Sequence, residues 1–403
     1  MAVVSLERAK AAPLKISLNM RFDAELTSFP DAIVPYLQNI RTLAVVFLPS
    51  TEKFTTMFPN FPQSMPSLRS LELSLVFDEH WDRSVDIFES FTPPLTRLSL
   101  GNIPLYPSTL SLTTLTEVTI FDPRFNLHLD ALLDFLEGNR SLESATLEID
   151  FLEPSLLTSR RRIPMKNQLR RLWIESWDAD DVQALISNIP IGRGSHLHVR
   201  LNGNARLSDI VPYIPRAYLL NLQSPTFFEV ENERTQRRIM LRGQGGTFSF
   251  GRHFEPEEPF EDFSGLPLDN IREVRLSYSK TSKKGSVVPP VFSPTPFPLL
   301  ETLTVEGGAN VLTTLSDLLS NPSSSPSLKT LVFFNCVLSE EFMEGLTTFA
   351  SERQISTTST WLHRILIVRG DGVFPSAAAI RKLGGYVKVV DVRMGDKLPA
   401  DLG

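Results

Sequence analysis

One short pattern, repeated along the chain, limits the possible folds more than any other feature of the sequence. Residues 328–338 read Leu-Lys-Thr-Leu-Val-Phe-Phe-Asn-Cys-Val-Leu. In a β-strand, Leu331 and Phe333 point to one face of the sheet, because side chains alternate along a strand. Val332 and Phe334 then point to the other face. Cys336 follows the strand, where a small polar group can be buried and can bond to a neighbouring turn.

The pattern recurs at intervals of 20 to 34 residues, most of them 27 to 29, on either side of an irregular middle between Val199 and Val274. Its spacing matches the template L-x-x-L-x-L-x-x-N/C-x-L of leucine-rich repeats, whose period is about 20–29 residues. A second apolar residue follows two positions after the first at each recurrence. The first inward-facing positions are Ile16, Leu43, Leu71, Leu98, Val118, Ala145, Leu172, Val199, Val274, Leu303, Leu331, Ile365 and Val390.

The segments between the strands predict the rest of the architecture. Several of them carry apolar residues at helical spacing after an Asp, Asn or Ser. Strand, turn, helix and turn at this period predict a right-handed α/β solenoid, a horseshoe with a parallel concave sheet and outer helices. We expect one solenoid over residues 1–403, with residues 1–12 forming a residual N-terminal helix that acts as a cap. The helices are expected at residues 31–39, 82–91, 130–139, 180–188, 310–320, 339–352 and 376–383.

The middle of the chain departs from this pattern. Residues 223–262 contain three short alternating runs, at 226–231, 237–242 and 247–251. They predict a strand meander that partly replaces helical returns. Gly243-Gln-Gly-Gly246 lacks the lysine of a phosphate-binding loop, so we interpret it as a hairpin turn. Residues 223–298 are therefore expected to form an irregular β-rich and loop-rich insertion within the solenoid.

Composition narrows the cellular setting and the classes of partner. A formal net charge of −6 gives no basic field, so neither nucleic acid nor an anionic membrane is expected as a partner. The chain has a single cysteine, which suits a reducing compartment. It also shows no signal peptide and no apolar run long enough for a membrane helix. We expect a monomer in the cytoplasm or nucleus. The basic run Arg160–Arg162 is interpreted as a solvated loop, with a nuclear-import or phosphate-binding role as the alternative.

Motifs for catalysis or for a cofactor are absent from the sequence, and we predict none of either. His196 and His198 alternate on one strand face and could place two ligands on a metal ion. No third ligand has suitable spacing, so surface histidines are the favoured interpretation and no metal site is predicted. Cys336 has the structural explanation given above, and its sequence neighbours include no cationic cluster that would activate a thiolate.

The outward strand positions offer a concrete binding hypothesis. A tryptophan flanked by arginine and glutamate has the composition of an interaction hot spot. The alternative is that a loop or the insertion covers this tryptophan as local core. The predicted partner-binding residues are Phe121, Glu148, Arg171, Trp173, Glu175, His198 and Arg200. A second outward set, which we expect to be covered, comprises Val332, Phe334, Leu366 and Val368.

Several segments resemble the repeat region of mushroom-type fungal F-box proteins. Leu6–Ile16 resembles the junction that follows the F-box, and Pro66–Leu73, Leu112–Phe121 and Leu129–Ser144 resemble the degenerate repeats. The resemblance implies the substrate-recruiting arm of a cullin-RING ubiquitin ligase. The F-box itself, a helical segment opening with a Leu-Pro signature, is not found in residues 1–13. Binding to a Skp-type adaptor is therefore expected only if an upstream F-box exists.

The sequence thus predicts a non-enzymatic protein-interaction module that recruits a protein target on its concave face. One alternative is a free-standing repeat scaffold with no link to a ubiquitin ligase. Another, from a different class, is an enzyme with a site in residues 223–298.

Overall fold

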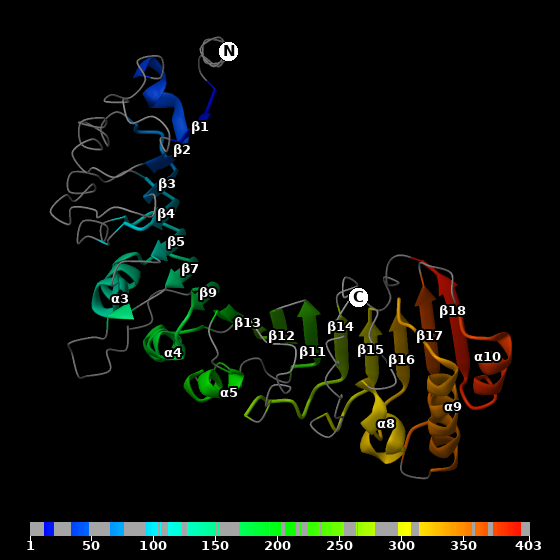
Figure 1. Cartoon of the computed structure of the whole chain (residues 1–403). Helices are drawn as coiled ribbons and strands as arrows, with labels where there is room; N and C mark the ends of the chain where they lie inside the picture. The colour runs from blue at the N-terminus through cyan, green and yellow to red at the C-terminus, as the bar shows by residue number, and fades with distance from the viewer. Residues whose placement is uncertain are drawn as a thin grey trace. The chain divides into compact units, whose positions relative to one another are not determined.

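A computed structural model represents the chain and is shown in Figure 1. The structure describes residues 12–19, 34–47, 65–75, 94–103, 105, 112–122, 127–149, 152–153, 169–192, 194–202, 206–214, 218, 225–233, 236–253, 263, 265–278, 297–307, 314–356, 359–369 and 374–395. The expected N-terminal cap helix, the expected helix at 82–91 and the basic run Arg160–Arg162 lie outside these residues. Within the described residues, no helix is long and apolar enough to cross a membrane.

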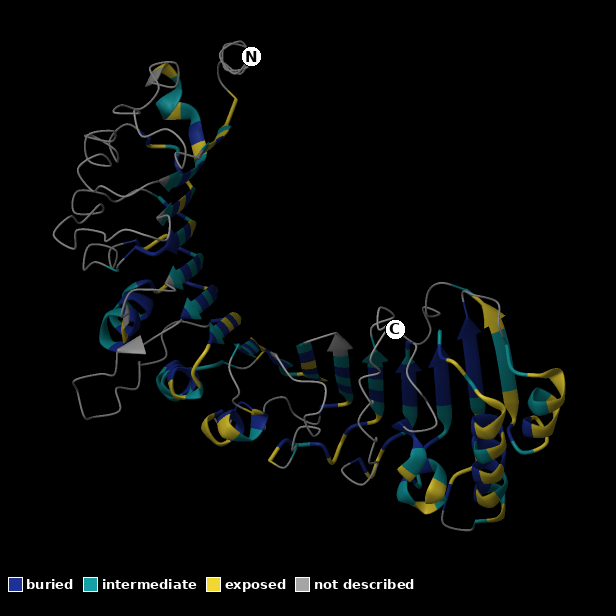
Figure 2. Cartoon of the chain, in the orientation of Figure 1, coloured by how far each residue is buried: buried dark blue, intermediate teal, exposed yellow. Residues whose placement is uncertain are grey.

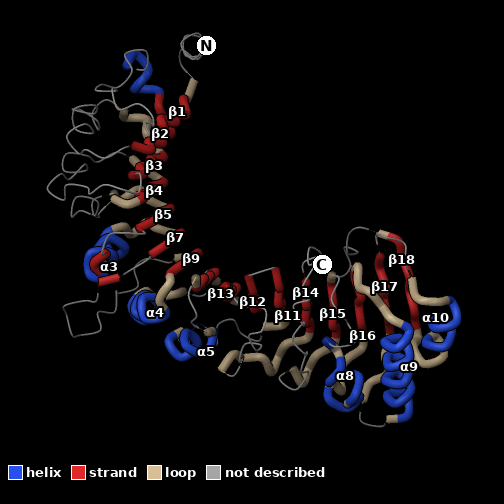
Figure 3. The backbone as a smooth tube through the Cα atoms, viewed as in Figure 1, coloured by secondary structure: helices blue, strands red, loops and turns tan. Residues whose placement is uncertain are grey.

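The chain divides into two compact units. The first comprises Met1–Gly203 with Tyr213–Pro215, and the second comprises Asn204–Pro212 with Arg216–Gly403. Both are α/β, with mostly parallel strands and helices in the returns (Figure 3). We describe each unit by itself.

In the first unit, every pair of neighbouring strands in the main sheet is parallel. The strands follow chain order across the sheet. They are β1 (Leu14–Asn19), β2 (Ile40–Phe47), β3 (Ser70–Leu75), β4 (Arg97–Gly101), β5 (Glu117–Asp122), β7 (Ser144–Ile149), β9 (Arg171–Ser176) and β10 (His196–Leu201). Two shorter strands, β6 (Leu127–His128) and β8 (Leu152–Glu153), pair separately.

The repeat register predicted from the sequence is confirmed from β1 to β9. Leu43, Leu71 and Leu98 pair as neighbours and are buried to 2% exposure or less. At β10 the predicted register is wrong by two residues, because Leu172 pairs with Leu197 rather than with Val199. A shift of two keeps every side chain on its predicted face. The alternation of buried and exposed residues along these strands is visible in Figure 2.

One helix of the first unit forms where helical spacing and a side-chain cap coincide. The helix α4 (Ala179–Asn188) follows Asp178, whose side chain accepts a hydrogen bond from the backbone N–H of Asp180. It buries Val182, Leu185 and Ile186. The helix α3 (Leu129–Gly138) also confirms a predicted helix. In contrast, the described part of the return at 31–39 is a 3-10 helix, η1 (Val34–Asn39).

In the second unit, the main sheet begins with an antiparallel meander and continues with parallel strands. In order across the sheet, the strands are β13 (Gly246–His253), β12 (Gln236–Gly243), β11 (Phe227–Glu233), β14 (Glu273–Tyr278), β15 (Thr302–Glu306), β16 (Thr330–Phe334), β17 (Arg364–Arg369) and β18 (Val389–Met394). The expected meander and the hairpin turn at Gly243–Gly246 are therefore present.

The place of the meander differs from the prediction, because its strands extend the main sheet instead of standing in for helical returns. Val230 pairs with Ile239 on one side and with Leu276 of β14 on the other, and all three are buried. Ile239 in turn pairs with buried Phe250. These apolar cross-strand pairs join the meander to the same buried layer as the repeats, which explains its position.

Helices of the second unit also confirm most of the predictions. The helix α9 (Glu340–Ile355) begins after Ser339, whose hydroxyl accepts from the N–H of Phe342 at 3.1 Å. The helix α10 (Ala377–Leu383) is capped in the same way by Ser376. The helix α8 (Ser316–Ser320) is shorter than the expected 310–320, of which 310–313 lie outside the described residues. Shorter helical segments are α5 (Leu207–Ile210), η3 (Val211–Tyr213) and η4 (Pro322–Ser324).

The turns that lead into successive strands are bonded to one another. The backbone N–H of Arg170 donates to the carbonyl of Glu143 at 2.8 Å, and that of His196 donates to the carbonyl of Arg170 at 2.7 Å. In the second unit, Lys329 donates to Glu301 and His363 donates to Lys329, each at 2.8 Å. Each turn therefore stabilises the next, and hydrogen bonding of the buried backbone continues past the strands themselves.

Candidate binding face

The seven predicted binding residues all lie on one face of four neighbouring strands, β5, β7, β9 and β10. The strand register arranges this face in three rows that cross the sheet. The rows are Glu117, Ser144, Arg171 and His196; then Thr119, Thr146, Trp173 and His198; then Phe121, Glu148, Glu175 and Arg200. We call these twelve residues the β5–β10 face.

Trp173 occupies the middle row of this face, and 37% of its surface is exposed. Its ring centroid lies 3.6 Å from that of His198, with an angle of 31° between the ring planes. The two-residue register shift at β10 is what places His198, rather than Arg200, beside the indole. Trp173 is therefore a partly exposed aromatic side chain held by an aromatic neighbour. The alternative in which it is buried as local core is wrong.

The third row places two carboxylates and one guanidinium side by side. Glu175 lies between the other two, and its Oε2 is 3.6 Å from Nη1 of Arg200. Its Oε1 accepts a hydrogen bond from Nδ2 of Asn202 at 3.0 Å. Glu148 lies on the other side of Glu175. Within the described ranges, no residue forms an ion pair or a side-chain hydrogen bond with the Glu148 carboxylate.

The electrostatic environment of Glu148 reflects this arrangement. Partial burial raises the pKa of the Glu148 carboxyl, and the neighbouring Glu175 raises it further, while Arg200 lowers it. Burial acts in this direction because it disfavours the charged form, and a like charge has the same effect. The face thus holds one carboxylate, Glu148, whose negative charge is incompletely compensated.

The outward apolar set of the second unit is buried, as expected. Val332, Phe334, Leu366 and Val368 form one cluster, with exposures of 5% or less. They pair in register across β16 and β17. This cluster is therefore part of a packed interior.

Cys336, His196 and His198, the residues considered above as possible catalytic or metal-binding groups, all have surroundings that favour a structural role. Cys336 is buried as predicted, but its Sγ donates to the carbonyl of Val305 within strand β15, at 3.2 Å, rather than to a turn, and burial raises the pKa of the thiol to about 12. A thiol in this state is a poor nucleophile. His198 packs against Trp173, and His196 is exposed at the end of the first row. Among the residues that the structure describes, no group of three metal-ligating side chains occurs.

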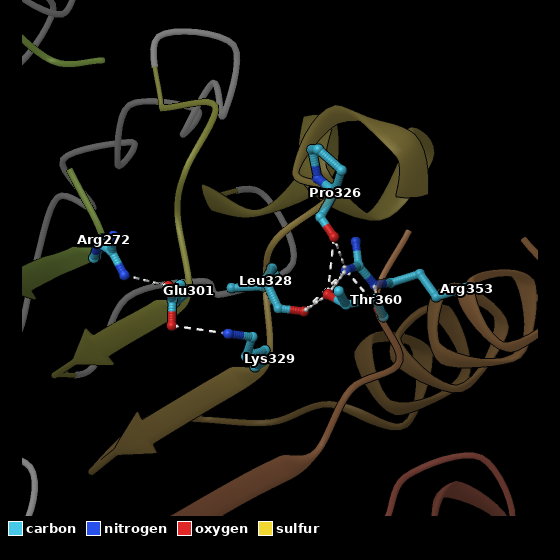
Figure 4. Close-up of polar contacts among 7 residues, drawn as sticks. All are labelled: Arg272, Glu301, Pro326, Leu328, Lys329, Arg353 and Thr360. Carbon is cyan, nitrogen blue, oxygen red and sulfur yellow. Dashed lines mark hydrogen bonds and ion pairs between the residues drawn. The ribbon is translucent and has the colours of Figure 1, made fainter. Parts of the chain in front are cut away.

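A cluster around Arg353 is the main feature that the sequence did not reveal. This arginine lies on α9 and has no exposed surface. Its Nη1 donates to the carbonyls of Pro322 and Ser325, each at 2.8 Å. Its Nη2 donates to Leu328 at 2.9 Å and to Thr360 at 2.8 Å (Figure 4). The arginine thus satisfies carbonyl groups of two turns, and such partners leave no signal in the sequence.

Beside this cluster, an ion ladder links the turns before three strands. Glu301 lies 2.9 Å from Nη1 of Arg272 and 3.0 Å from Nζ of Lys329 (Figure 4). Lys329 first, and Arg272 with it, lower the pKa of the Glu301 carboxyl. The side chains of Arg272, Glu301 and Lys329 are 61%, 32% and 42% exposed, respectively. The ladder is therefore a surface feature of small energetic value.

Comparison with known proteins leaves the family open. No family model matches the chain, and a search of curated proteins finds no significant match.

Proposed function

We propose that the chain is a leucine-rich repeat solenoid that binds another protein through the β5–β10 face. The observation that carries this proposal is Trp173, 37% exposed, in the middle row of a sheet face and stacked on His198. Aromatic side chains held rigidly in such a position contribute much of the energy of protein interfaces. The charged residues around it, Arg171, Glu175 and Arg200, supply a polar rim.

The resemblance to fungal F-box proteins gives this binding a biological role. If the resemblance extends to function, the β5–β10 face recruits a target for a cullin-RING ubiquitin ligase. A Skp-type adaptor then binds an F-box segment upstream of the repeats. The second candidate is a repeat scaffold with no ligase link, and the same face would serve it. Mapping the 5′ end of the transcript separates the two, because an in-frame Leu-Pro helical segment supports the ligase role.

Proximity labelling followed by titration with the purified partner tests the binding proposal. We expect Trp173→Ala to weaken the partner's affinity by more than about 1 kcal/mol, roughly fivefold, without unfolding the chain. The matched control is Trp361→Ala, which removes a tryptophan that is 55% exposed in the turn before β17. Unchanged affinity in Trp173→Ala would remove this residue from the interface. Turnover in a panel of hydrolase substrates would overturn the non-enzymatic assignment.

A further inference from the structure

The β5–β10 face carries a charge pattern that selects among protein partners. Its third row runs Phe121, Glu148, Glu175, Arg200, so the single guanidinium stands at one end of the row. The nearer carboxylate, Glu175, forms the ion pair with Arg200 and also accepts from Asn202. Glu148, one strand further away, keeps a half-buried carboxylate beside a like charge.

The second unit contains a different arrangement of one arginine and two carboxylates on neighbouring strands. There, Arg275 stands between two carboxylates on neighbouring strands, Glu229 and Glu306. It lies 3.5 Å from the first and 2.5 Å from the second. Arg275 thus lies within ion-pair distance of two acids, whereas Arg200, at the end of its row, forms an ion pair with Glu175. The first unit therefore leaves a position for a cation that the second unit fills from its own chain.

The neighbouring row supplies the second part of the site. His198 covers one side of Trp173, and on the other side the row continues with Thr146 and Thr119. Thr146 lies directly opposite Trp173, and Glu148 lies two residues further along the same strand on the same face, diagonal to the indole. An aromatic ring beside a carboxylate attracts a cation twice, through the π-face of the ring and through the charge.

From this geometry we infer that the β5–β10 face binds a protein segment through one lysine or arginine side chain, which lies against Trp173 and pairs with Glu148. The inference rests on the proposed function, because it names the partner chemistry of the same face. Arg171 and His196 at the opposite end of the strands disfavour a second cation there. The face therefore selects a single basic side chain and disfavours a polybasic tract.

The test is selection from a phage-displayed library of random linear peptides on the full chain, repeated on Glu148→Gln. Glu72→Gln is the matched control, since Glu72 is exposed on the same sheet face at β3, outside the twelve residues. Glu72→Gln removes one negative charge at a different place, so it measures how much of any loss in peptide affinity comes from the lower net charge alone. Thermal melting of the three proteins checks that each is folded.

We expect the wild-type chain to enrich peptides with one lysine or arginine at a fixed position. The enriched peptides should bind Glu148→Gln about five- to tenfold more weakly and bind Glu72→Gln unchanged. Replacing the peptide's basic residue by glutamine should lower affinity more for the wild type than for Glu148→Gln, because the variant keeps only the contact with the Trp173 ring.

Two other outcomes contradict the inference and are distinguishable. Peptides that depend on Trp173 but lack a basic residue, or that bind Glu148→Gln equally well, overturn the cation-binding role and leave the proposed function standing. If no selected peptide depends on Trp173, the proposed function falls, and the cation-binding role falls with it.

Discussion

The carbonyl oxygen of Thr360 accepts hydrogen bonds from two nitrogens of Arg353, from Nε at 3.2 Å and from Nη2 at 2.8 Å. The same guanidinium reaches the turn at residues 322–328, so one side chain of α9 joins the turns before β16 and β17. Burial lowers the pKa of Arg353 to about 10, which leaves it charged at neutral pH. Backbone carbonyl groups and the ring of Phe349, 5.4 Å away, face this charge.

Arg353→Ala is expected to destabilise the second unit by about 3 kcal/mol or more, because several buried carbonyls lose their donor at once. Arg353→Lys should recover little, since an ammonium group cannot reproduce the planar fork of donors. Urea unfolding, followed by alkylation of Cys336 in the same unit, measures the loss. Arg381→Ala on α10 is the control, because that guanidinium is exposed and, among the residues that the structure describes, bonds to the carbonyl of Ala377 in its own helix. A change below about 0.5 kcal/mol in Arg353→Ala would contradict the assigned role.

Gly307 is required by both backbone conformation and space. Its φ is +104°, and a Cβ there would lie 2.0 Å from the carbonyl oxygen of Tyr278. Gly307→Ala should therefore destabilise the second unit by more than about 2 kcal/mol. Gly194→Ala isolates the conformational part, since Gly194 has a φ of +77° but no atom within 4 Å of the added Cβ. Thermal unfolding of both variants tests this, and equal losses would show that the contact with Tyr278 relaxes freely.

Glu148 should make the stability of the first unit depend on pH. The pKa of its carboxyl in the folded state is raised above the ordinary value of 4.5, so its favourable contribution to stability is complete below that pH. The contribution is lost as pH rises through the folded pKa, because the native state then holds a half-buried charge beside Glu175. Glu148→Gln should flatten this dependence and be at least as stable as wild type at neutral pH. Unfolding curves at several pH values check this, and a less stable variant at neutral pH would contradict it.

Cys336 should be unreactive in the native chain. Its thiol is buried with a pKa raised to about 12, and iodoacetamide reacts with the thiolate. We expect alkylation at neutral pH to be slow in buffer and fast in denaturant. Because the chain has one cysteine, mass spectrometry reports this site alone. Rapid labelling of the folded chain would show that the turn between β16 and α9 opens readily.

The sequence predicted the faces of the strands more reliably than their register. Alternation has a period of two, so Trp173 and His198 were assigned to the correct face even though β10 was misaligned. The misalignment arises in the return after α4. There the hydroxyl of Ser195 donates to the carbonyl of Leu169 at 2.6 Å and fixes where β10 begins. A bond from a small polar side chain to a backbone group has no distinctive spacing in the sequence.

Long-range pairing limited the prediction in two further places. The alternating runs of the meander identified strands β11 to β13, but alternation alone does not say which strand they join. The sequence placed the charged residues Glu148, Glu175 and Arg200 on one face of the sheet. Which carboxylate Arg200 compensates depended on the β9–β10 register.

The turn-to-turn hydrogen bonds have a consequence for how such a chain changes length. In the described part of the first unit, the turn before each strand bonds to the turn before the next strand, from Arg41 and Arg69 through to Arg170 and His196. Ala145 and Leu172 occupy equivalent positions 27 residues apart. Excising one whole period therefore brings together two edges that already match in register and in backbone donors and acceptors. We therefore expect the fold to tolerate the insertion or deletion of a complete period better than that of a partial one. A partial period would shift the register of every strand that follows it.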